Sequence, residues 1–144
     1  MRVQDVPGST TRAVVTIEPS DTIADTVYLL KEHSIGAVVV SSDDKKILGI
    51  SSERDVVRHL ALEHEGTLRV KVEDLMTENV TTCQLDDDVE ATMLVMTAGR
   101  FRHIPIVNSD NELCGIVSLG DLADARLKDL EAQNLELREP SANT

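Results

Sequence analysis

The stretch that decides the fold is GISSERD at residues 49–55, which is repeated 66 residues later as GIVSLGD at residues 115–121. The same offset aligns the flanking residues without a gap, for example Val38 with Ile104. A fixed internal period sets the architecture before single residues are interpreted. Because the unit is short and occurs twice, we expect one compact module in which two similar halves pack face to face.

The composition disfavours several classes of function. The 144 residues carry a net charge of −12, from 14 Lys and Arg against 26 Asp and Glu, so the overall field repels nucleic acids and anionic membranes. Tyr28 and Phe101 are the only aromatic residues, which disfavours base stacking. No apolar run reaches the roughly 18 residues of a spanning helix, and the N-terminus lacks an apolar signal region. Cys83 and Cys114 have no motif spacing, which is typical of thiols in a reducing compartment. We expect a soluble cytoplasmic protein with no nucleic-acid or membrane partner.

The first half shows a clear order of expected elements. An apolar strand at 14–17 leads through a turn rich in capping side chains to a helix, whose apolar residues recur at helical spacing over 23–30. Strands at 35–40 and 47–51 follow, and a second helix begins at Ser52.

The second half repeats this order. Its first strand lies near Thr82, its first helix starts at Val89, strands follow at 104–107 and 113–117, and its second helix begins at Ser118. The unit is therefore β-α-β-β-α. We expect an α/β (α+β) fold in which two such repeats pack with pseudo-two-fold symmetry and helices cover the sheets.

We place the first repeat, with an N-terminal segment, at residues 1–66 and the second, with an extended C-terminal helix, at residues 67–138. The helix extension keeps an apolar side after the repeat has ended, and we expect this side to pack on a partner subunit or to fold back. Residues 139–144 are expected to form a disordered tail. The apolar residues of the extension are Leu127, Leu130, Leu135 and Leu137.

With this element order and the repeated Gly-x-x-Ser-x-x-Asp step, the chain resembles the cystathionine β-synthase (CBS) domain family, as a stand-alone tandem pair over roughly residues 3–126. The resemblance implies a disc-shaped module with two clefts between its paired sheets. Such clefts commonly bind adenosine ligands, including AMP, ADP, ATP, NAD-type dinucleotides and S-adenosylmethionine. The resemblance also implies that two pairs assemble into a flat homodimer.

Asp55 and Asp121 are expected in the first turn of a helix, three residues after Ser52 and Ser118. A helix N-terminus offers unpaired N–H groups and a partial positive charge to a phosphate, and the Ser hydroxyl adds a donor. A carboxylate one turn further on can accept both hydrogens of a ribose diol. The same residues would also form an ordinary helix cap. Because both copies carry them, we favour ribose binding.

Arg100, Arg102 and His103 form the largest difference between the two copies, since the uncharged residues 34–37 stand at their places in the first repeat. The resemblance implies that side chains just before this strand meet the phosphates. Arg suits a phosphate because its planar fork is always charged, and His103 adds pH sensitivity near neutrality. We expect two unequal clefts, and we expect the cleft that holds Asp121 and this cluster to bind phosphate better. The alternative is a solvated helix end.

Five further positions resemble the family's adenine-side contacts. Thr16 and Thr82 lie near the first strand of each half, and backbone groups of the apolar strand residues commonly meet the base edge in this family. Residues of these types also suit strands without any ligand, so this alternative stays open. The apolar positions are Ala37, Val38 and Ile104.

Arg54 departs from its repeat, where Gly120 stands at the matching position. Its guanidinium either approaches a phosphate in the first cleft or pairs with Glu53 or Glu18 at the surface. We favour the surface pairing.

The remaining motifs predict neither a metal site nor catalysis. His59 and His64 are five apart, which does not match the one-turn spacing of a helical metal pair. The acidic run at 86–88 precedes a helix, where carboxylates cap the helix and interact favourably with its dipole. The sequence has no nucleophile–base pattern and no phosphate-binding glycine loop, so we do not expect an enzyme.

We therefore expect a regulatory module that binds an adenosine nucleotide, with AMP as the first choice, as a regulatory ligand rather than a catalytic cofactor. Occupancy would be transmitted through the packing of two subunits or of an unidentified effector protein. Such signalling requires a ligand that binds one arrangement more tightly than the other. The alternative is an oligomerisation or interaction scaffold that works without a ligand.

Overall fold

The structure is a computed structural model of the chain. It describes the backbone of residues 1–9 and 13–142, and the side chains of these residues except 63–64 and 138–142. Up to residue 69 the elements are η1 (Val3–Asp5), β1 (Thr16–Ile17), α1 (Ile23–Glu32), β2 (Ala37–Val40), β3 (Gly49–Ser52), α2 (Glu53–Glu63) and η2 (His64–Arg69). They are followed by α3 (Val72–Leu75), α4 (Val89–Gly99), β4 (His103–Val107), β5 (Leu113–Ser118) and α5 (Leu119–Ala142).

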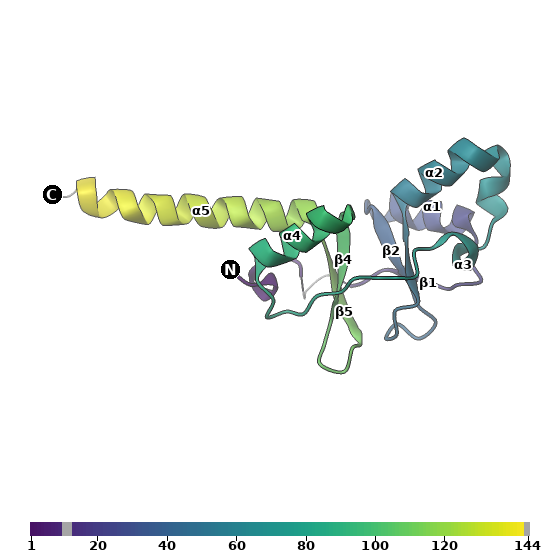
Figure 1. Cartoon of the computed structure of the whole chain (residues 1–144), viewed down its shortest axis with the longest axis horizontal. Helices are drawn as coiled ribbons and strands as arrows, with labels where there is room; N and C mark the ends of the chain where they lie inside the picture. Colours follow the sequence, from purple (N-terminus) through teal and green to yellow (C-terminus); the bar gives the residue numbers. More distant parts are fainter. Residues whose placement is uncertain (10–12, 143–144) are drawn as a thin grey trace.

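The two sheets share one hydrogen-bonding register, displaced by the length of the repeat. β2 runs antiparallel to β3 with Ala37 opposite Ser52, and β4 runs antiparallel to β5 with His103 opposite Ser118. Figure 1 shows the two sheets side by side in the middle of the molecule, with α1 to α3 beyond one sheet and α4 and α5 beyond the other. The expected α+β fold, built from two similar halves, is confirmed.

The first strand of the repeat differs between the halves. In the first half β1 lies parallel to β2, with Ile17 opposite Val40. In the second half a single parallel bridge from Cys83 to Ile106 takes its place, at the same register. The strand expected near Thr82 is therefore reduced to one bridge within the described residues.

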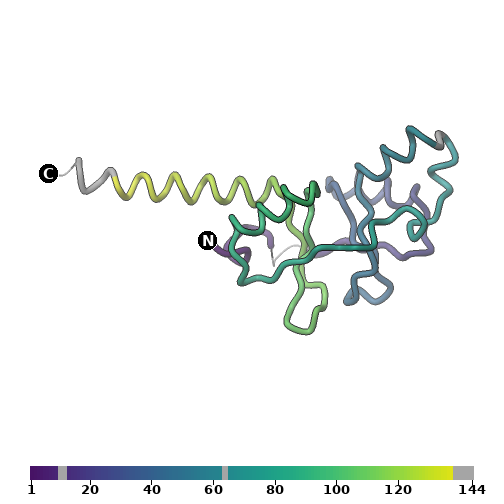
Figure 2. Tube along the Cα trace, viewed as in Figure 1, coloured from purple at the N-terminus to yellow at the C-terminus, as the bar shows by residue number. Residues whose placement is uncertain are grey.

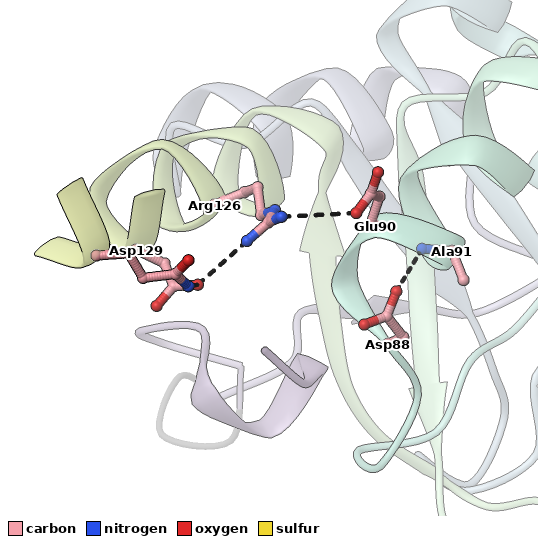
Figure 3. Close-up of polar contacts among 6 residues, drawn as sticks. Asp88, Glu90, Ala91, Arg126 and Asp129 are labelled. Atoms are coloured by element: carbon pink, nitrogen blue, oxygen red, sulfur yellow. Dashed lines mark hydrogen bonds and ion pairs between the residues drawn. The ribbon is translucent and has the colours of Figure 1, made fainter. Parts of the chain in front are cut away.

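Side-chain caps set where the first helix of each half begins. The Thr22 hydroxyl accepts from the Asp25 N–H at 3.4 Å, and Asp25 accepts from the Thr22 N–H at 3.0 Å, which forms a capping box. Asp88 accepts from the Ala91 N–H at 2.9 Å at the start of α4 (Figure 3). The capping interpretation of the acidic run at 86–88 is confirmed for its last residue.

The core of each half is completed by a segment that precedes the other half in the sequence. Val3 and Val6 lie in the core of the second half, where the Val3 N–H donates to the Asp87 carbonyl at 2.9 Å. Val72 lies in the core of the first half, where its N–H donates to the Asp21 carbonyl at 2.7 Å. Figure 2 shows the N-terminal segment beside the second half of the chain. The two halves are therefore interlocked.

This exchange crosses the boundary that we predicted between the two repeats. We assigned the N-terminal segment to the first repeat, within residues 1–66, but its apolar side chains pack with the second repeat. In turn the segment around Val72, which we assigned to the second repeat within residues 67–138, packs with the first. A core of about 60 residues is marginal, and each half gains buried apolar area from the exchanged segment.

The repeated glycine of each copy lies where an exchanged segment crosses the strand. A Cβ on Gly49 would lie 2.9 Å from the Thr77 carbonyl oxygen and 2.6 Å from the Met76 sulfur. A Cβ on Gly115 would overlap the Ser9 carbonyl oxygen. Backbone atoms cannot rotate away as side chains do, so the glycine that both copies share is a requirement of packing.

α5 is held to the second half only over its first turns. Leu122 and Ala125 are buried in the core, and Arg126 pairs with Glu90 of α4 at 3.6 Å and with Asp129 at 3.2 Å (Figure 3). Beyond this point the helix projects away from the body (Figure 1), so the extension does not fold back on the described chain.

The projecting part of α5 keeps its apolar residues exposed. The helix continues to Ala142, so it takes in part of the segment 139–144 that we expected to form a tail, and residues 143–144 lie outside the described residues. None of the helices in the described ranges is both long and apolar enough to cross a membrane. The exposed leucines are Leu127, Leu130, Leu135 and Leu137.

Gly115→Ala is expected to destabilise the fold by about 1–3 kcal/mol, because the added methyl group meets the backbone of Ser9 in a close-packed contact. Urea unfolding measures this difference. Gly66→Ala is the matched control, since nothing lies within 4 Å of its Cβ position, and its unfolding free energy should stay within about 0.5 kcal/mol of wild type. Equal unfolding midpoints for Gly115→Ala and wild type would contradict the crossing contact.

Candidate functional site

Two cavities lie between the halves, and each takes its lining from both. The larger, of about 500 Å³, is lined by the start of α2, by residues within 77–81, by residues 99–103 and by Gly36. The smaller, of about 220 Å³, is lined by residues 34–37, by the end of β5 and by Asp121, together with His103 and two residues before β1. We call them the Asp55 cleft and the Asp121 cleft.

In the Asp55 cleft the helix-start residues are already paired. The Ser52 hydroxyl donates to Asp55 Oδ2 at 2.9 Å and accepts from the Asp55 N–H at 3.2 Å. The Thr77 hydroxyl, from the segment that crosses β3, also donates to Asp55 Oδ2 at 3.4 Å. Both Ser52 and Asp55 are half-buried and line the cavity. The carboxylate is thus held at the cavity wall by residues from two separate segments.

The Asp121 cleft repeats this arrangement. Asp121 Oδ2 accepts from the Ser118 N–H at 3.2 Å, and the Ser118 hydroxyl accepts from the Asp121 N–H at 3.0 Å. The cap that the sequence allowed is therefore formed in both halves. Because each carboxylate also faces a cavity, capping does not exclude a second role in ligand binding.

The cationic cluster lies in the Asp55 cleft, which corrects our expectation. Arg100 and Arg102 line this cleft and not the Asp121 cleft, where we had placed them. The start of β2 faces the start of α5, and the start of β4 faces the start of α2. Residues 99–103 therefore lie beside α2. Arg54 spans the junction, where its Nη1 donates to the Arg100 carbonyl at 2.9 Å. The clefts are unequal, as expected. Our prediction that the Asp121 cleft binds phosphate better, however, assigned Arg100 and Arg102 to the wrong cleft.

The described linings of the two clefts differ in charge. Four guanidinium groups line the Asp55 cleft with two carboxylates, whereas among the described residues of the smaller cleft Asp121 is the only Asp or Glu and there is no Lys or Arg. We favoured a surface pairing for Arg54, but this side chain lines the cleft. The four arginines are Arg54, Arg58, Arg100 and Arg102, and the two carboxylates are Glu53 and Asp55.

The family model for the CBS domain matches residues 3–62 and 72–128, which cover most of both halves. The chain belongs to the CBS domain family. Two related sequences illustrate the range of lengths in which such a pair occurs. The chain is 36% identical over 117 residues to an uncharacterized 17.7 kDa protein of Acidianus ambivalens, covering 81% of this chain and 70% of the relative. It is 33% identical over 113 residues to inosine-5'-monophosphate dehydrogenase of Methanocaldococcus jannaschii, covering 78% of this chain but only 22% of that protein.

Solved structures match the fold of the CBS pair over nearly its whole length. A CBS-domain containing protein from Agrobacterium tumefaciens is 40% identical with a TM-score of 0.82, covering 88% of this chain and 99% of that chain. A CBS domain protein from Pyrobaculum aerophilum, complexed with AMP, is 25% identical with a TM-score of 0.78, covering 93% of this chain and 99% of that chain.

His103 forms part of the wall between the two clefts of this CBS pair. It lines both cavities, and a Cβ on Gly36 would lie 2.8 Å from its Cε1 and 2.9 Å from its Nε2. Only a residue without a side chain at position 36 therefore lets the imidazole occupy this place.

Burial lowers the pKa of His103 below its ordinary value of 6.5. The carboxylates of Glu53 and Asp121 act in the opposite direction, and the guanidiniums of Arg102 and Arg54 lower the pKa further. At neutral pH the ring is therefore uncharged, and a bound phosphate nearby would favour its protonation.

The positions that we expected beside the adenine are only partly at the clefts. Ala37 lines the Asp121 cleft, but the side chains of Val38 and Ile104 are fully buried in the two cores. Thr16 donates its hydroxyl to Asp44, and Thr82 is half-buried outside the linings of both cavities. The hydroxyl groups of Thr16 and Thr82 are therefore not at the clefts, while base contacts through the backbone of Ala37, Val38 and Ile104 stay a prediction.

Sequence reasoning missed two parts of the Asp55 cleft. Arg58 stands four residues after Arg54, and this one-turn spacing was a usable signal that both lie on one helix face. Thr77, Asn79, Val80 and Thr81 had no comparable signal, because they reach the cleft only through the exchange of segments.

Among the histidines outside the clefts, His59 has a structural contact. His59 Nδ1 lies 2.9 Å from the buried Thr67 hydroxyl, while the side chain of His64 lies outside the described residues. Within the described part of the chain, no three or more His, Cys, Asp or Glu side chains are grouped as a metal site.

His103→Gln is expected to change the pH dependence of stability. Because the folded pKa is lowered, the unfolded chain binds the proton more readily, and the folded protein loses stability as pH falls from 6.5 through the folded pKa. Above pH 6.5 this contribution is fully present. Urea unfolding over a pH series should show a shallower loss in His103→Gln than in wild type. His33→Gln, at an exposed position, should retain the wild-type profile, and a wild-type profile in His103→Gln would refute the assignment.

Proposed function

We propose that this CBS pair is a regulatory module that binds adenosine nucleotides, AMP among them, in the clefts between its halves. The observation that carries the proposal is the repeated Ser–Asp helix start, which lines a cavity in both halves. The structural relative from Pyrobaculum aerophilum, which is complexed with AMP, supports the choice of ligand.

Each cleft offers the groups that a nucleotide needs. The start of α2 or α5 presents the positive end of the helix dipole to a phosphate. Asp55 or Asp121 accepts the hydroxyls of the ribose through charge-assisted hydrogen bonds, each worth about 1.5–3 kcal/mol. The ligand is bound and released unchanged, so the module acts as a sensor and not as an enzyme.

Occupancy is transmitted because the clefts lie between the two halves. A nucleotide in the Asp55 cleft contacts α2 of the first half and residues 99–103 of the second at once. It therefore favours one relative position of the halves, provided that its affinity for that arrangement is higher. A second subunit or an effector protein that contacts both halves would respond to this change.

The nucleotide proposal is tested by thermal melting of ligand-free protein with AMP. At about 100 times its Kd, AMP should stabilise the fold by roughly 2.7 kcal/mol. Asp55→Asn keeps a capping oxygen but loses the charge, so AMP affinity in this cleft should fall about tenfold, which corresponds to roughly 1.4 kcal/mol.

Asp124→Ala is the control for this experiment, because Asp124 is exposed on α5 and lies outside both clefts. It should retain the wild-type AMP response. Unchanged melting with AMP, ADP, ATP and NAD would end the proposal and favour a scaffold that works without a ligand.

The projecting part of α5 supports a second copy of the chain as the partner. Leu127, Leu130, Asn134 and Leu137 follow the three-four-three spacing of a coiled-coil seam, and all four side chains are exposed. The seam is self-complementary, and an Asn at such a position favours a single register between two parallel helices. We propose that α5 pairs with its copy in a homodimer, which would also serve the scaffold function.

Leu130→Glu is expected to weaken this dimer, because it places two carboxylates in an apolar seam. Sedimentation velocity should show a shift toward monomer at a concentration where wild type is dimeric. Leu135→Glu is the matched control, since Leu135 is also exposed but lies off the seam. Equal effects of the two substitutions would contradict pairing through the seam.

A further inference from the structure

The Asp55 cleft brings four guanidinium groups together from both halves of the chain. Arg54 and Arg58 stand one turn apart on α2, and Arg100 and Arg102 precede β4. In the described part of the chain, the basic side chains that form ion pairs are Arg126 and Lys128, and these four are not among them. Among the described residues, their charges are therefore not neutralised by direct ion pairs.

This charge exceeds what a single phosphate group can pair with. A phosphate monoester has three terminal oxygens, and one bidentate Arg contact already uses two of them. With Asp55 on the ribose, the arginines are available to the phosphates, opposed only by Glu53 among the lining carboxylates. In a chain with a net charge of −12, such a local excess of positive charge attracts an anionic ligand to this cleft.

The described lining of the Asp121 cleft differs. Its volume is about 220 Å³ against about 500 Å³, and no Lys or Arg is among the described residues that line it. The residues opposite Asp121 are Ser34, Ile35, Gly36 and Ala37. These described residues offer no cationic group to a ligand with several phosphates.

We infer that the Asp55 cleft takes adenosine nucleotides with two or more phosphate groups in preference to AMP, and that Arg58 and Arg102 determine this preference. The inference deepens the proposed function and rests on it.

Isothermal titration calorimetry with AMP, ADP and ATP, each without divalent cations, tests the preference. ADP and ATP should bind about tenfold or more tightly than AMP, and this ratio should fall as salt rises, because exposed charges are screened. Arg58→Gln and Arg102→Gln should each lower ADP and ATP affinity about tenfold while AMP affinity changes less. Arg69→Gln, an exposed arginine outside both clefts, should keep the wild-type ratio.

The outcomes separate this inference from the proposed function. If AMP binds as tightly as ADP and ATP, or if the ratio survives both cleft substitutions, the inference is wrong while nucleotide binding stands. If none of the three nucleotides binds, the proposed function itself is wrong. Melting curves of the unliganded variants show whether a lost preference reflects the cleft or a damaged fold. Arg102→Lys keeps the charge, so it should retain more affinity for ADP than Arg102→Gln if the cleft is responsible.

Discussion

The structure depends on the exchange of the segments that precede the two repeats. Val3 and Val6 are buried with the second sheet, and Val72 is buried with the first, so neither half retains its core if the two separate. Gly49 and Gly115 must be glycines, because backbone atoms of these segments lie where a Cβ would stand. The repeat is therefore not two independent domains in series but one interlocked unit with its functional surfaces at the junction.

The same interlocking assigns charge to the clefts. Because the start of β4 faces the start of α2, the side chains of Arg100 and Arg102 line the cleft at α2 rather than the cleft at α5. The hydrogen bond from Arg54 to the Arg100 carbonyl holds this junction. Two similar helix starts thus differ in the charge of the described residues around them, and the uncharged His103, which lines both clefts, lies where a change in one cleft can reach the other.

Periodicity predicted most of the fold, because strand register and helix caps are set by local patterns that the two copies share. Thr22 and Asp88 cap the first helices at equivalent positions, and Ser52 and Ser118 cap the second. The exchange was not predictable from such patterns, since Val3 and Val72 are ordinary apolar residues whose partners are distant in sequence. The wrong cleft for Arg100 and Arg102 has the same origin: proximity to Asp121 along the chain suggested one site, but packing across the junction decided it. Thr77 and its neighbours were missed for that reason as well.

The central claim is that a nucleotide binds across the two halves, first in the Asp55 cleft. An amide NMR titration of ligand-free protein with ADP tests it most directly, because each residue reports its own occupancy. The account predicts that the earliest shifts appear together at Asp55, Thr77 and residues 100–103, with Asp121 responding only at higher concentration. Shifts that begin at Asp121, or that stay within one half of the chain, would contradict it.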